Sequence, residues 1–393
     1  MPSLEQTCGQ TCGCGGSGQL SAPRLRGDTP EKAGLDPEEI RQLVREVHDL
    51  TTGPRPWAAG AVLIVGRGPY VAVEEAMGWA VRYAAYDEEK DEGVELPPDS
   101  RIPMTTSTPF DLASLTKLFT SVAAVQQIER GTLGIDARVG AYLPDFRAAA
   151  RHGVTVRQLL THTSGLRPEL PLYDCADDAE RLEMLRAEPP IGVPGTYCYS
   201  DLNLLLLQHV LERITSRTLD VLIHDGITRP LGMTATHFGP CAGAAATEDQ
   251  RRPWAKADRG MLRGTVHDEN AWALGGVAGH AGLFATGHDL AVFCRALLSG
   301  GAYGPARILG PDFVELLLTP PGLGFAVDQP WFMGELAGRG AAGHTGFTGT
   351  SLVLDPATDS FLVLLANTVH PRRRGADSGP RARAGSRVAR AMR

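Results

Sequence analysis

The sequence predicts an α/β (α+β) fold, in which an antiparallel sheet is built from both ends of the chain and carries flanking helices plus an inserted, mostly helical region. Residues 59–80 read as two strands around a Gly-rich turn, and residues 350–369 read as two apolar strands around a DPATDS turn. Between them, from 111 to about 230, apolar residues recur at helical spacing. A chain of 393 residues, 43% of them hydrophobic, is long enough to bury a sizeable core.

Residues 1–35 are expected to form a flexible leader. Three of the seven cysteines, Cys8, Cys12 and Cys14, fall in its Gly-rich part. Their C-x3-C-x-C spacing brings no fourth ligand within reach, so free thiols are favoured over a metal site.

Residues 36–110 and 285–370 are expected to form the sheet region, and residues 111–284 the mostly helical region. The segment 36–110 is expected to begin with a helix over residues 37–50, because the apolar residues of that stretch are spaced to share one helix face. Three helices are predicted in the helical region, over residues 115–131, 154–165 and 201–215.

Residues 371–393 carry eight arginines and one aspartate. Because the segment lacks apolar periodicity, it is expected to be a basic, disordered tail. The rest of the chain is acidic, since the net charge is −7, and this argues against nucleic acid as a main partner.

The chain has no apolar run of the roughly 18 residues that a membrane helix needs. Its first residues also lack the basic start and the apolar stretch of a signal peptide. The sequence therefore predicts a cytoplasmic protein without a membrane partner.

The stretch DLASLTKLFT, residues 111–120, places Ser114 and Lys117 three positions apart in an apolar run. If a helix begins near 112–114, the two side chains share one face, and Ser114 lies in the first turn, where backbone N–H groups lack partners inside the helix. A lysine in a partly desolvated site more readily accepts a proton from a hydroxyl, and free N–H groups stabilise an oxyanion. Ser114 is therefore a candidate nucleophile, although a capping serine followed by a surface lysine gives the same pattern.

Two further segments give this pair its context. Tyr199 stands directly before the helix predicted over 201–215, and GHTGFTGTSLVLDP, residues 343–356, runs from a Gly-rich stretch into a strand. The order Ser-x-x-Lys, then Tyr-x-(Asn or Asp), then (Lys or His)-Thr-Gly is typical of one large group of active-site serine enzymes.

Over roughly residues 36–370 the chain resembles the serine β-lactamase and DD-peptidase (penicillin-binding protein) superfamily, in the branch of class C β-lactamases and related esterases. The resemblance rests on the three motifs and on further segments such as VTVRQLLTHTSGL and RPLGMTATHFGP. It implies a β-lactamase/transpeptidase-like fold and a two-step acyl transfer that requires no cofactor and no metal.

The resemblance also implies the catalytic roles. Ser114 attacks an ester or amide carbonyl, while Lys117 and Tyr199 handle the proton, since a phenol with a pKa near 10 needs a cationic neighbour to act as a base at neutral pH. The oxyanion hole consists of the backbone N–H groups of Ser114 and Phe347.

Four further residues are expected on the substrate-binding side: Asp201, His344, Thr345 and Gly346. Gly346 would let the substrate lie close against the strand. Asp201 stands where many members have Asn, and a carboxylate cannot donate the amide hydrogen bond. His344 stands where Lys is usual and is largely neutral at pH 7 if unperturbed. Both changes weaken recognition of an anionic, amide-bearing substrate such as a penicillin.

The sequence therefore predicts a serine hydrolase for a small-molecule ester, amide or peptide substrate. Three alternatives stay open: a D-alanyl-D-alanine carboxypeptidase or β-lactamase, an acyltransferase that uses the same acyl-enzyme, and a non-catalytic member that binds a ligand in the cleft. The intact Ser114, Lys117 and Tyr199 count against the last.

Three histidines, His162, His267 and His280, are expected to be structural and hydrogen-bonded. A metal site from His267, Asp268, Glu269 and His280 is not favoured, because nothing gives these residues ligand spacing on one face.

Overall fold

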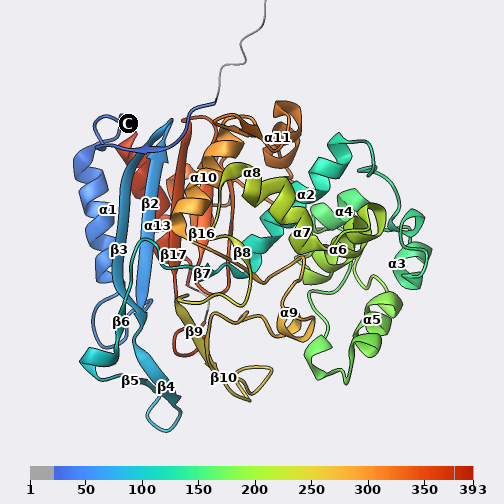
Figure 1. The fold of residues 1–393 in the computed structure, drawn as a ribbon, viewed down its shortest axis with the longest axis horizontal. Coiled ribbons are helices and arrows are strands. Elements are labelled where there is room, and N and C mark those ends of the chain that lie inside the picture. The colour runs from blue at the N-terminus through green and yellow to red at the C-terminus, as the bar shows by residue number, and fades with distance from the viewer. Residues whose placement is uncertain (1–21, 376, 393) are drawn as a thin grey trace, which may run out of the picture.

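The central sheet joins strands from both ends of the chain (Figure 1). The computed structural model describes residues 22–375 and 377–392. The strands are β1 (Arg26–Gly27), β2 (Gly60–Arg67), β3 (Tyr70–Val81), β6 (Ile102–Pro103), β14 (Ala326–Val327), β15 (Ala342–Thr345), β16 (Ser351–Asp355) and β17 (Ser360–Ala366). Their order is β1-β3-β2-β17-β16-β15-β14, with β6 paired to β3. All pairs are antiparallel except β1 with β3, which are parallel.

Both predicted strand pairs are confirmed as hairpins, β2 with β3 and β16 with β17. Strand β2, GAVLIVGR, is buried up to its last residue, which explains its continuous apolar run. The β2–β3 turn contains Gly68 at φ 54°, a conformation that glycine adopts without steric cost. Strand β17 then pairs with β2, from Ser360 opposite Arg67 to Ala366 opposite Ala61, and this pairing closes the sheet between the two chain ends.

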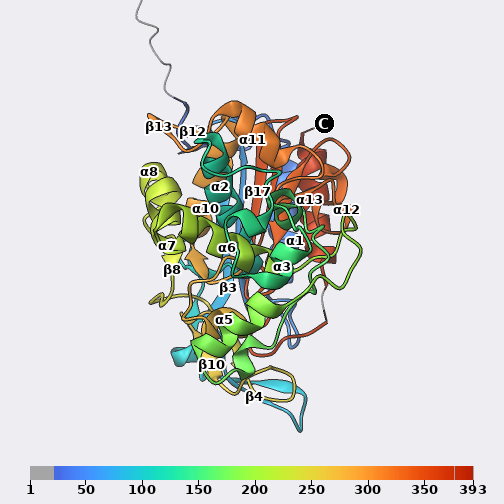
Figure 2. The same ribbon diagram turned by 90° about the vertical axis from the view of Figure 1, so that its right-hand side faces the viewer.

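Each face of the sheet is covered by its own set of helices (Figures 1 and 2). On one face, α1 (Pro37–Asp49), α12 (Pro330–Met333) and α13 (Gly379–Ala391) bury one hydrophobic cluster with the sheet. On the other face, α10 (Gly287–Leu298) and the helical region bury a second, larger cluster. The cleft described below lies between the sheet and this helical region.

The helical region agrees with the predicted segments to different degrees. Its helices are α2 (Thr116–Glu129), α3 (Arg147–Arg151), α4 (Val156–Leu160), α5 (Asp178–Ala187), α6 (Asp201–Thr215), α7 (Leu219–Ile223), α8 (Arg229–Leu231) and α9 (Glu269–Ala273). Helix α6 spans the predicted residues. Helix α4 ends at Leu160, short of the predicted 165, because His162 adopts φ 55°, which a right-handed helix does not contain.

The expectation of a disordered tail over 371–393 is wrong, because α13 occupies most of that segment. The helix buries Ala384, Val388 and Ala391 against the sheet and α1, at the i, i+4 and i+7 spacing of one helix face. Its Arg387 pairs with Glu39 and Glu46 of α1 at 2.9 and 2.7 Å. The apolar face of this helix consists mainly of alanines, so the arginine-rich sequence showed no clear apolar periodicity.

The expected flexible leader, 1–35, is also wrong where the structure describes it. From residue 22 onward the segment contributes β1 to the sheet and buries Leu35, which is 3% exposed. The prediction of free thiols at Cys8, Cys12 and Cys14 concerns residues outside those that the structure describes. Cys175, Cys198, Cys241 and Cys294 are free thiols.

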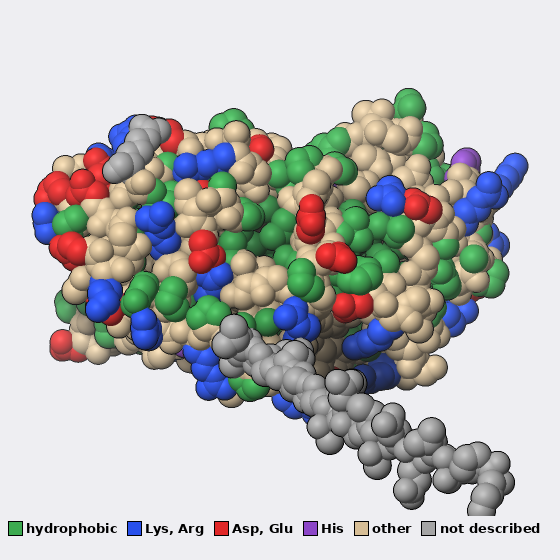
Figure 3. Space-filling model, turned by 90° about the horizontal axis from the view of Figure 1, so that it is seen from above, with side chains coloured by type: hydrophobic (Ala, Val, Ile, Leu, Met, Phe, Trp, Pro, Cys, Tyr) green, Lys and Arg blue, Asp and Glu red, His purple; other side chains and the backbone are tan. Residues whose placement is uncertain are grey.

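Among the described helices, none combines the length and the apolar character needed to cross a membrane. On the face shown in Figure 3, acidic and basic side chains are interspersed among apolar ones.

Candidate active site

Ser114 lies in a 3-10 turn, Ala113–Leu115, that leads directly into α2. The preceding residue, Ala113, adopts φ 46°, a conformation that is costly for a residue with a side chain. Asp111 fixes this turn, because its Oδ1 accepts from the Ala113 N–H at 2.8 Å and its Oδ2 accepts from the His267 N–H at 2.6 Å. Asp111 is 1% exposed, and burial raises the pKa of its carboxyl. Sequence reasoning missed this residue, although it directly precedes the predicted helix.

Ser114, Lys117 and Tyr199 come together as the sequence predicts. Lys117 Nζ donates to Ser114 Oγ at 2.8 Å, and the Tyr199 hydroxyl donates to the same oxygen at 2.9 Å. The Lys117 ammonium also lies 4.9 Å from the centre of the Tyr199 ring. A nucleophile with two proton-carrying neighbours in hydrogen-bond range has the geometry of an activated serine.

The protonation states of Lys117 and Tyr199 follow from burial and from the charges beside them. Burial is the largest single influence and lowers the pKa of Lys117, but Asp201 and Tyr199 together outweigh it and raise the pKa above its ordinary value. The pKa of Tyr199 is raised by burial, which the Lys117 charge opposes only in part. In the resting site Lys117 is therefore an ammonium and Tyr199 a neutral phenol.

Asp201 is held against Lys117. One of its carboxylate oxygens lies 2.8 Å from Lys117 Nζ, and its side chain is 21% exposed. Lys117 Nζ also donates to the His280 backbone carbonyl at 3.1 Å. The carboxylate that replaces the common Asn therefore faces the proton-handling lysine.

Tyr199 owes its position to the residues around the start of α6. The backbone N–H of Ser200 donates to His162 Nδ1 at 3.1 Å, and Ser200 Oγ donates to the Arg167 carbonyl at 2.6 Å. The His162 ring lies 4.7 Å from the Tyr199 ring, and burial, together with the Lys117 charge, lowers the pKa of His162 to about 3. His162 is thus a neutral hydrogen-bonding residue, as the sequence predicted.

Strand β15 places the third motif beside Ser114. His344, Thr345, Gly346 and Phe347 line the same cavity as Ser114 and Tyr199. His344 Nδ1 donates to the Thr345 carbonyl at 2.7 Å, and burial followed by the Lys117 charge lowers the pKa of His344 to about 4. This histidine is neutral at pH 7. The Phe347 side chain is 55% exposed.

We expected Gly346 to make room for the substrate, but it makes room for Thr350 and Leu112 of this protein. A Cβ at this position would lie 2.1 Å from Thr350 Oγ1 and 2.5 Å from the Leu112 carbonyl oxygen. The missing side chain therefore lets β15 approach the turn that carries Ser114. Ser114 and Phe347, whose N–H groups are the expected oxyanion donors, both line the same cavity.

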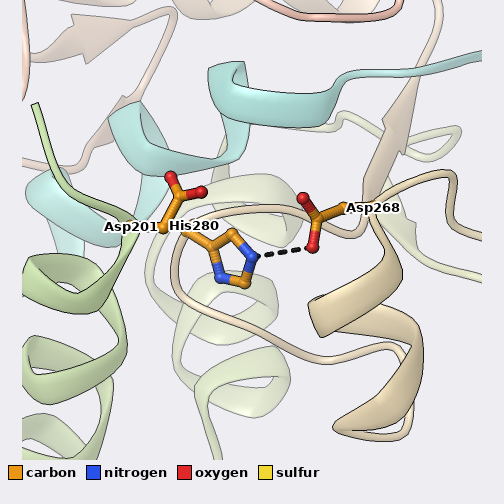
Figure 4. A group of neighbouring side chains, drawn as sticks. All are labelled: Asp201, Asp268 and His280. Carbon is orange, nitrogen blue, oxygen red and sulfur yellow. Dashed lines mark hydrogen bonds and ion pairs between the residues drawn. The ribbon is translucent and has the colours of Figure 1, made fainter. Parts of the chain in front are cut away.

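The acidic and histidine side chains near the site are paired with one another (Figure 4). His280 Nε2 and Asp268 Oδ1 lie 2.9 Å apart, and Figure 4 shows the His280 ring turned toward Asp268, with Asp201 on the other side of His280. His267 Nε2 lies 2.8 Å from Glu248, which confirms the hydrogen-bonding character expected of both histidines. Ligand atoms of Asp201, Asp268 and His280 fall within 4.8 Å of one another, but Asp201 already neutralises the Lys117 ammonium.

Ser114 and Tyr199 line a cavity of about 740 Å³. Its walls are rich in aromatic side chains and in arginines that the motif pattern did not indicate: Trp57, Tyr197, Trp331, Arg55, Arg374 and Arg381. These residues come from loops, from α12 and from α13, so they carry no local sequence signature. A cavity of this size accommodates a small organic substrate.

The chain is similar to known proteins over most of its length. A family model described as Beta-lactamase matches residues 40–386. A relative from Escherichia coli (strain K12), named as an inferred D-alanyl-D-alanine carboxypeptidase, is 32% identical over 389 residues, which cover 88% of this chain and 86% of the relative.

Two solved structures show the same fold. EstCE1, described as a hydrolase with promiscuous acyltransferase activity, aligns with a TM-score of 0.67 at 21% identity, covering 89% of this chain and 98% of that chain. A class C beta lactamase from Rhodobacter sphaeroides aligns with a TM-score of 0.64 at 21% identity, covering 91% and 98%. The predicted β-lactamase/transpeptidase-like fold is thereby confirmed.

Proposed function

The chain belongs to the beta-lactamase family, and from this premise we propose that Ser114 is the nucleophile on which this serine hydrolase carries its acyl group. One observation supports the assignment above all. Ser114 Oγ lies 2.8 Å from Lys117 Nζ and 2.9 Å from the Tyr199 hydroxyl, at the wall of the large cavity.

In the resting site Lys117 and Tyr199 are both protonated, so neither can accept the proton of Ser114. One of them must therefore lose a proton before acylation. Asp201, in contact with Lys117, is the acceptor within reach. Lys117 passes a proton to Asp201, and the free amine takes the Ser114 proton while Oγ bonds to the substrate carbonyl carbon. Asp201 thus joins the proton-handling residues.

The leaving group then departs with a proton from Tyr199 as its bond to the carbonyl carbon breaks. Tyr199 regains a proton from Lys117, and Lys117 regains one from Asp201, so the leaving group ends with the proton that Ser114 lost. Water attacks the acyl-enzyme by the same path in reverse, which frees the acid and restores the Ser114 hydroxyl. The backbone N–H groups of Ser114 and Phe347 stabilise the oxyanion in both steps.

The substrate is an ester or a small peptide amide. The neutral His344 and the carboxylate of Asp201 support the ester, since neither offers the contacts that the common Lys and Asn supply. The name of the Escherichia coli relative, at 32% identity, supports a peptide ending in D-alanyl-D-alanine as the second candidate. Location in the cytoplasm stays a prediction of the sequence.

The test is a matched set of substrates assayed on the purified protein. p-Nitrophenyl butyrate and butyryl p-nitroanilide share the acyl group and differ only in the bond that breaks, and an acylated tripeptide ending in D-alanyl-D-alanine represents the peptidase. We expect turnover of the ester that is lost in Ser114→Ala. Ser121→Ala, a change about two helical turns further on at a buried hydroxyl, is the control and keeps the activity.

Hydrolysis of the D-alanyl-D-alanine peptide at a higher kcat/KM than the ester would assign the peptidase instead. Turnover unchanged by Ser114→Ala on all three substrates would refute the nucleophile.

A further inference from the structure

We propose that Asp111 is a positioning residue that holds the two halves of the oxyanion hole in place relative to each other. One half is the turn that carries Ser114, and the other is the turn after β15 that carries Phe347. This inference rests on the proposed function, in which the N–H groups of Ser114 and Phe347 stabilise the oxyanion. It gives a role in the reaction to a residue that lies outside all three motifs.

The first half depends on the side chain of Asp111. This residue ends strand β7 (Phe110–Asp111), which pairs with β11 (Leu283–Ala285). Its Oδ1 accepts from the N–H of Ala113, the residue directly before Ser114, at 2.8 Å. Ala113 adopts φ 46°, which is costly for a residue with a side chain, so this hydrogen bond stabilises the backbone conformation that leads into Ser114.

The second half is bound to the backbone of the same residue. Residues 346–349 form a turn that contains Phe347 and is closed by a hydrogen bond from its last N–H to its first carbonyl oxygen at 3.1 Å. Thr348 Oγ1 donates to the Asp111 carbonyl oxygen at 2.7 Å. Thr348 is buried, so this hydrogen bond is shielded from water. Asp111 therefore contacts one turn through its carboxylate and the other through its carbonyl.

His267 adds a further connection between Asp111 and Phe347. Asp111 Oδ2 accepts from the His267 N–H at 2.6 Å, and the centre of the His267 ring lies 5.5 Å from that of the Phe347 ring. His267 Nε2 lies 2.8 Å from Oε2 of Glu248, which is fully buried. Because more than half of the Phe347 side chain is exposed, its place depends on contacts such as this one.

Both oxygens of the Asp111 carboxylate serve backbone N–H groups beside the expected oxyanion donors. Burying a carboxylate is unfavourable unless its oxygens are hydrogen-bonded, and these two contacts meet that need. A change at Asp111 should therefore displace the turns around it. The effect of an oxyanion hole depends on the exact place of its donors, so such a displacement should weaken transition-state binding more than substrate binding.

A pair of substrates that differ in one atom tests the inference. p-Nitrophenyl butyrate and p-nitrophenyl thionobutyrate share the leaving group, but sulfur, a weaker hydrogen-bond acceptor, replaces the carbonyl oxygen in the second. The measurement is the ratio of kcat/KM for the oxo and the thiono ester, divided by the ratio of their rates with hydroxide. This normalised ratio reports on the oxyanion hole and is independent of the fraction of folded protein.

For the unmodified protein we expect a normalised ratio of at least about 100, the usual effect of an oxyanion donor. In Asp111→Asn the ratio falls by at least about 10-fold, because an amide NH2 then faces one of the two N–H donors. Thr348→Val removes the hydroxyl that binds the Asp111 carbonyl and lowers the ratio by about 3-fold.

Two controls accompany these variants. Asp289 is a buried carboxylate of the same kind, since its Oδ2 accepts from the Ala235 N–H at 2.9 Å and from the Thr236 hydroxyl at 2.8 Å. Burial raises the pKa of both carboxyls, of Asp111 and of Asp289. Asp289→Asn keeps the ratio. Tyr199→Phe lowers kcat/KM for both esters and keeps the ratio, because it removes a proton-handling group and no oxyanion donor.

A normalised ratio near 1 for the unmodified protein would overturn the inference, and this result does not depend on the folding of any variant. A high ratio that Thr348→Val leaves unchanged would also overturn it, and this variant decides the question if Asp111→Asn does not fold. Failure of the proposed function looks different, because turnover of both esters would then be independent of Ser114.

Discussion

Lys117 is a fully buried ammonium whose charge is set by its neighbours. Its exposure is 0%, and burial lowers its pKa, but the Asp201 carboxylate at 2.8 Å and Tyr199 together keep the pKa above the ordinary value. A lysine that stays charged cannot accept the Ser114 proton until it has lost its own. In the mechanism that we propose, Asp201 is therefore the group that takes this proton from Lys117.

Asp201→Asn restores the residue that many members carry and removes the proton acceptor. We expect kcat/KM at pH 7 to fall by about 100-fold, the usual contribution of a general base. The pKa of Lys117 falls once the raising effect of Asp201 is gone, so activity in the variant should recover as the pH rises and the amine becomes neutral.

The pH dependence of kcat/KM from pH 6 to 10, measured for both proteins, checks this expectation. A merely structural role for Asp201 would lower activity at every pH without recovery. Full activity of Asp201→Asn at pH 7 would contradict the assignment of Asp201 to proton handling.

At the scale of single residues, motifs predicted Ser114, Lys117 and Tyr199 because their chemistry is tied to short spacings. They did not predict Asp111 or Arg381. Asp111 acts through backbone hydrogen bonds, and Arg381 reaches the cavity from a segment whose composition suggested disorder. The ion pair of Asp201 with Lys117 also depends on the packing of α6 against α2, which a local sequence pattern does not predict.

At the scale of elements, the contact between β15 and the turn that carries Ser114 holds the site together. Gly346→Ala would place a Cβ 2.1 Å from Thr350 Oγ1 and 2.5 Å from the Leu112 carbonyl, so the strand must move away. We expect kcat/KM for p-nitrophenyl butyrate to fall by about 100-fold, since displacements of the order of 1 Å have such effects. Gly27→Ala, in β1, meets no atom within 4 Å and is the control. Equal activity of the two variants would show that the close approach is not needed.

Helix α13 supports a second prediction about an element. Val388 is 0% exposed in the cluster between the sheet, α1 and α13. Val388→Ala should lower the free energy of unfolding by about 2 kcal/mol, through lost burial and a residual cavity. Denaturant titration measures this, with Arg383→Ala on the exposed face as the control. No loss of stability in Val388→Ala would indicate that residues 379–391 do not pack as a helix.

At the scale of the whole molecule, the order of the elements along the chain predicted the architecture well. Strand patterns at both ends and helical patterns between them require a sheet that closes across the chain, and β17 pairs with β2 in that way. The parallel pairing of β1 with β3 and the packing of α13 were not predicted. Both segments have little periodicity of apolar residues in their sequence. Their structure depends on packing against the rest of the molecule.

Four histidines, His162 and His370 buried and His209 and His344 half-buried, make the stability of the folded state depend on pH in the same direction. Burial is the main cause that lowers the pKa of His162 to about 3 and those of His209, His344 and His370 to about 4. In the unfolded chain the same groups take up protons near pH 6.5. Between pH 6.5 and 4 the unfolded state binds more protons, so stability is full above about pH 6.5 and is lost as the pH falls through this range.

Denaturant titrations between pH 7.5 and 4.5 measure this loss. His209→Gln should reduce the slope of the unfolding free energy against pH, since one of these histidines is removed. His152→Gln, at an exposed position, is the control. An unfolding free energy that stays constant from pH 7 to pH 5 would contradict neutral burial of these histidines.

Acylation of Ser114 is tested most directly by intact-protein mass spectrometry within seconds of mixing with p-nitrophenyl butyrate, with p-nitrophenol release followed in parallel. We expect one added butyryl group on the protein and a burst of p-nitrophenol, and both should be absent in Ser114→Ala and present in Ser121→Ala. A protein that releases p-nitrophenol without an adduct, at a rate that Ser114→Ala leaves unchanged, would contradict an acyl-enzyme on Ser114.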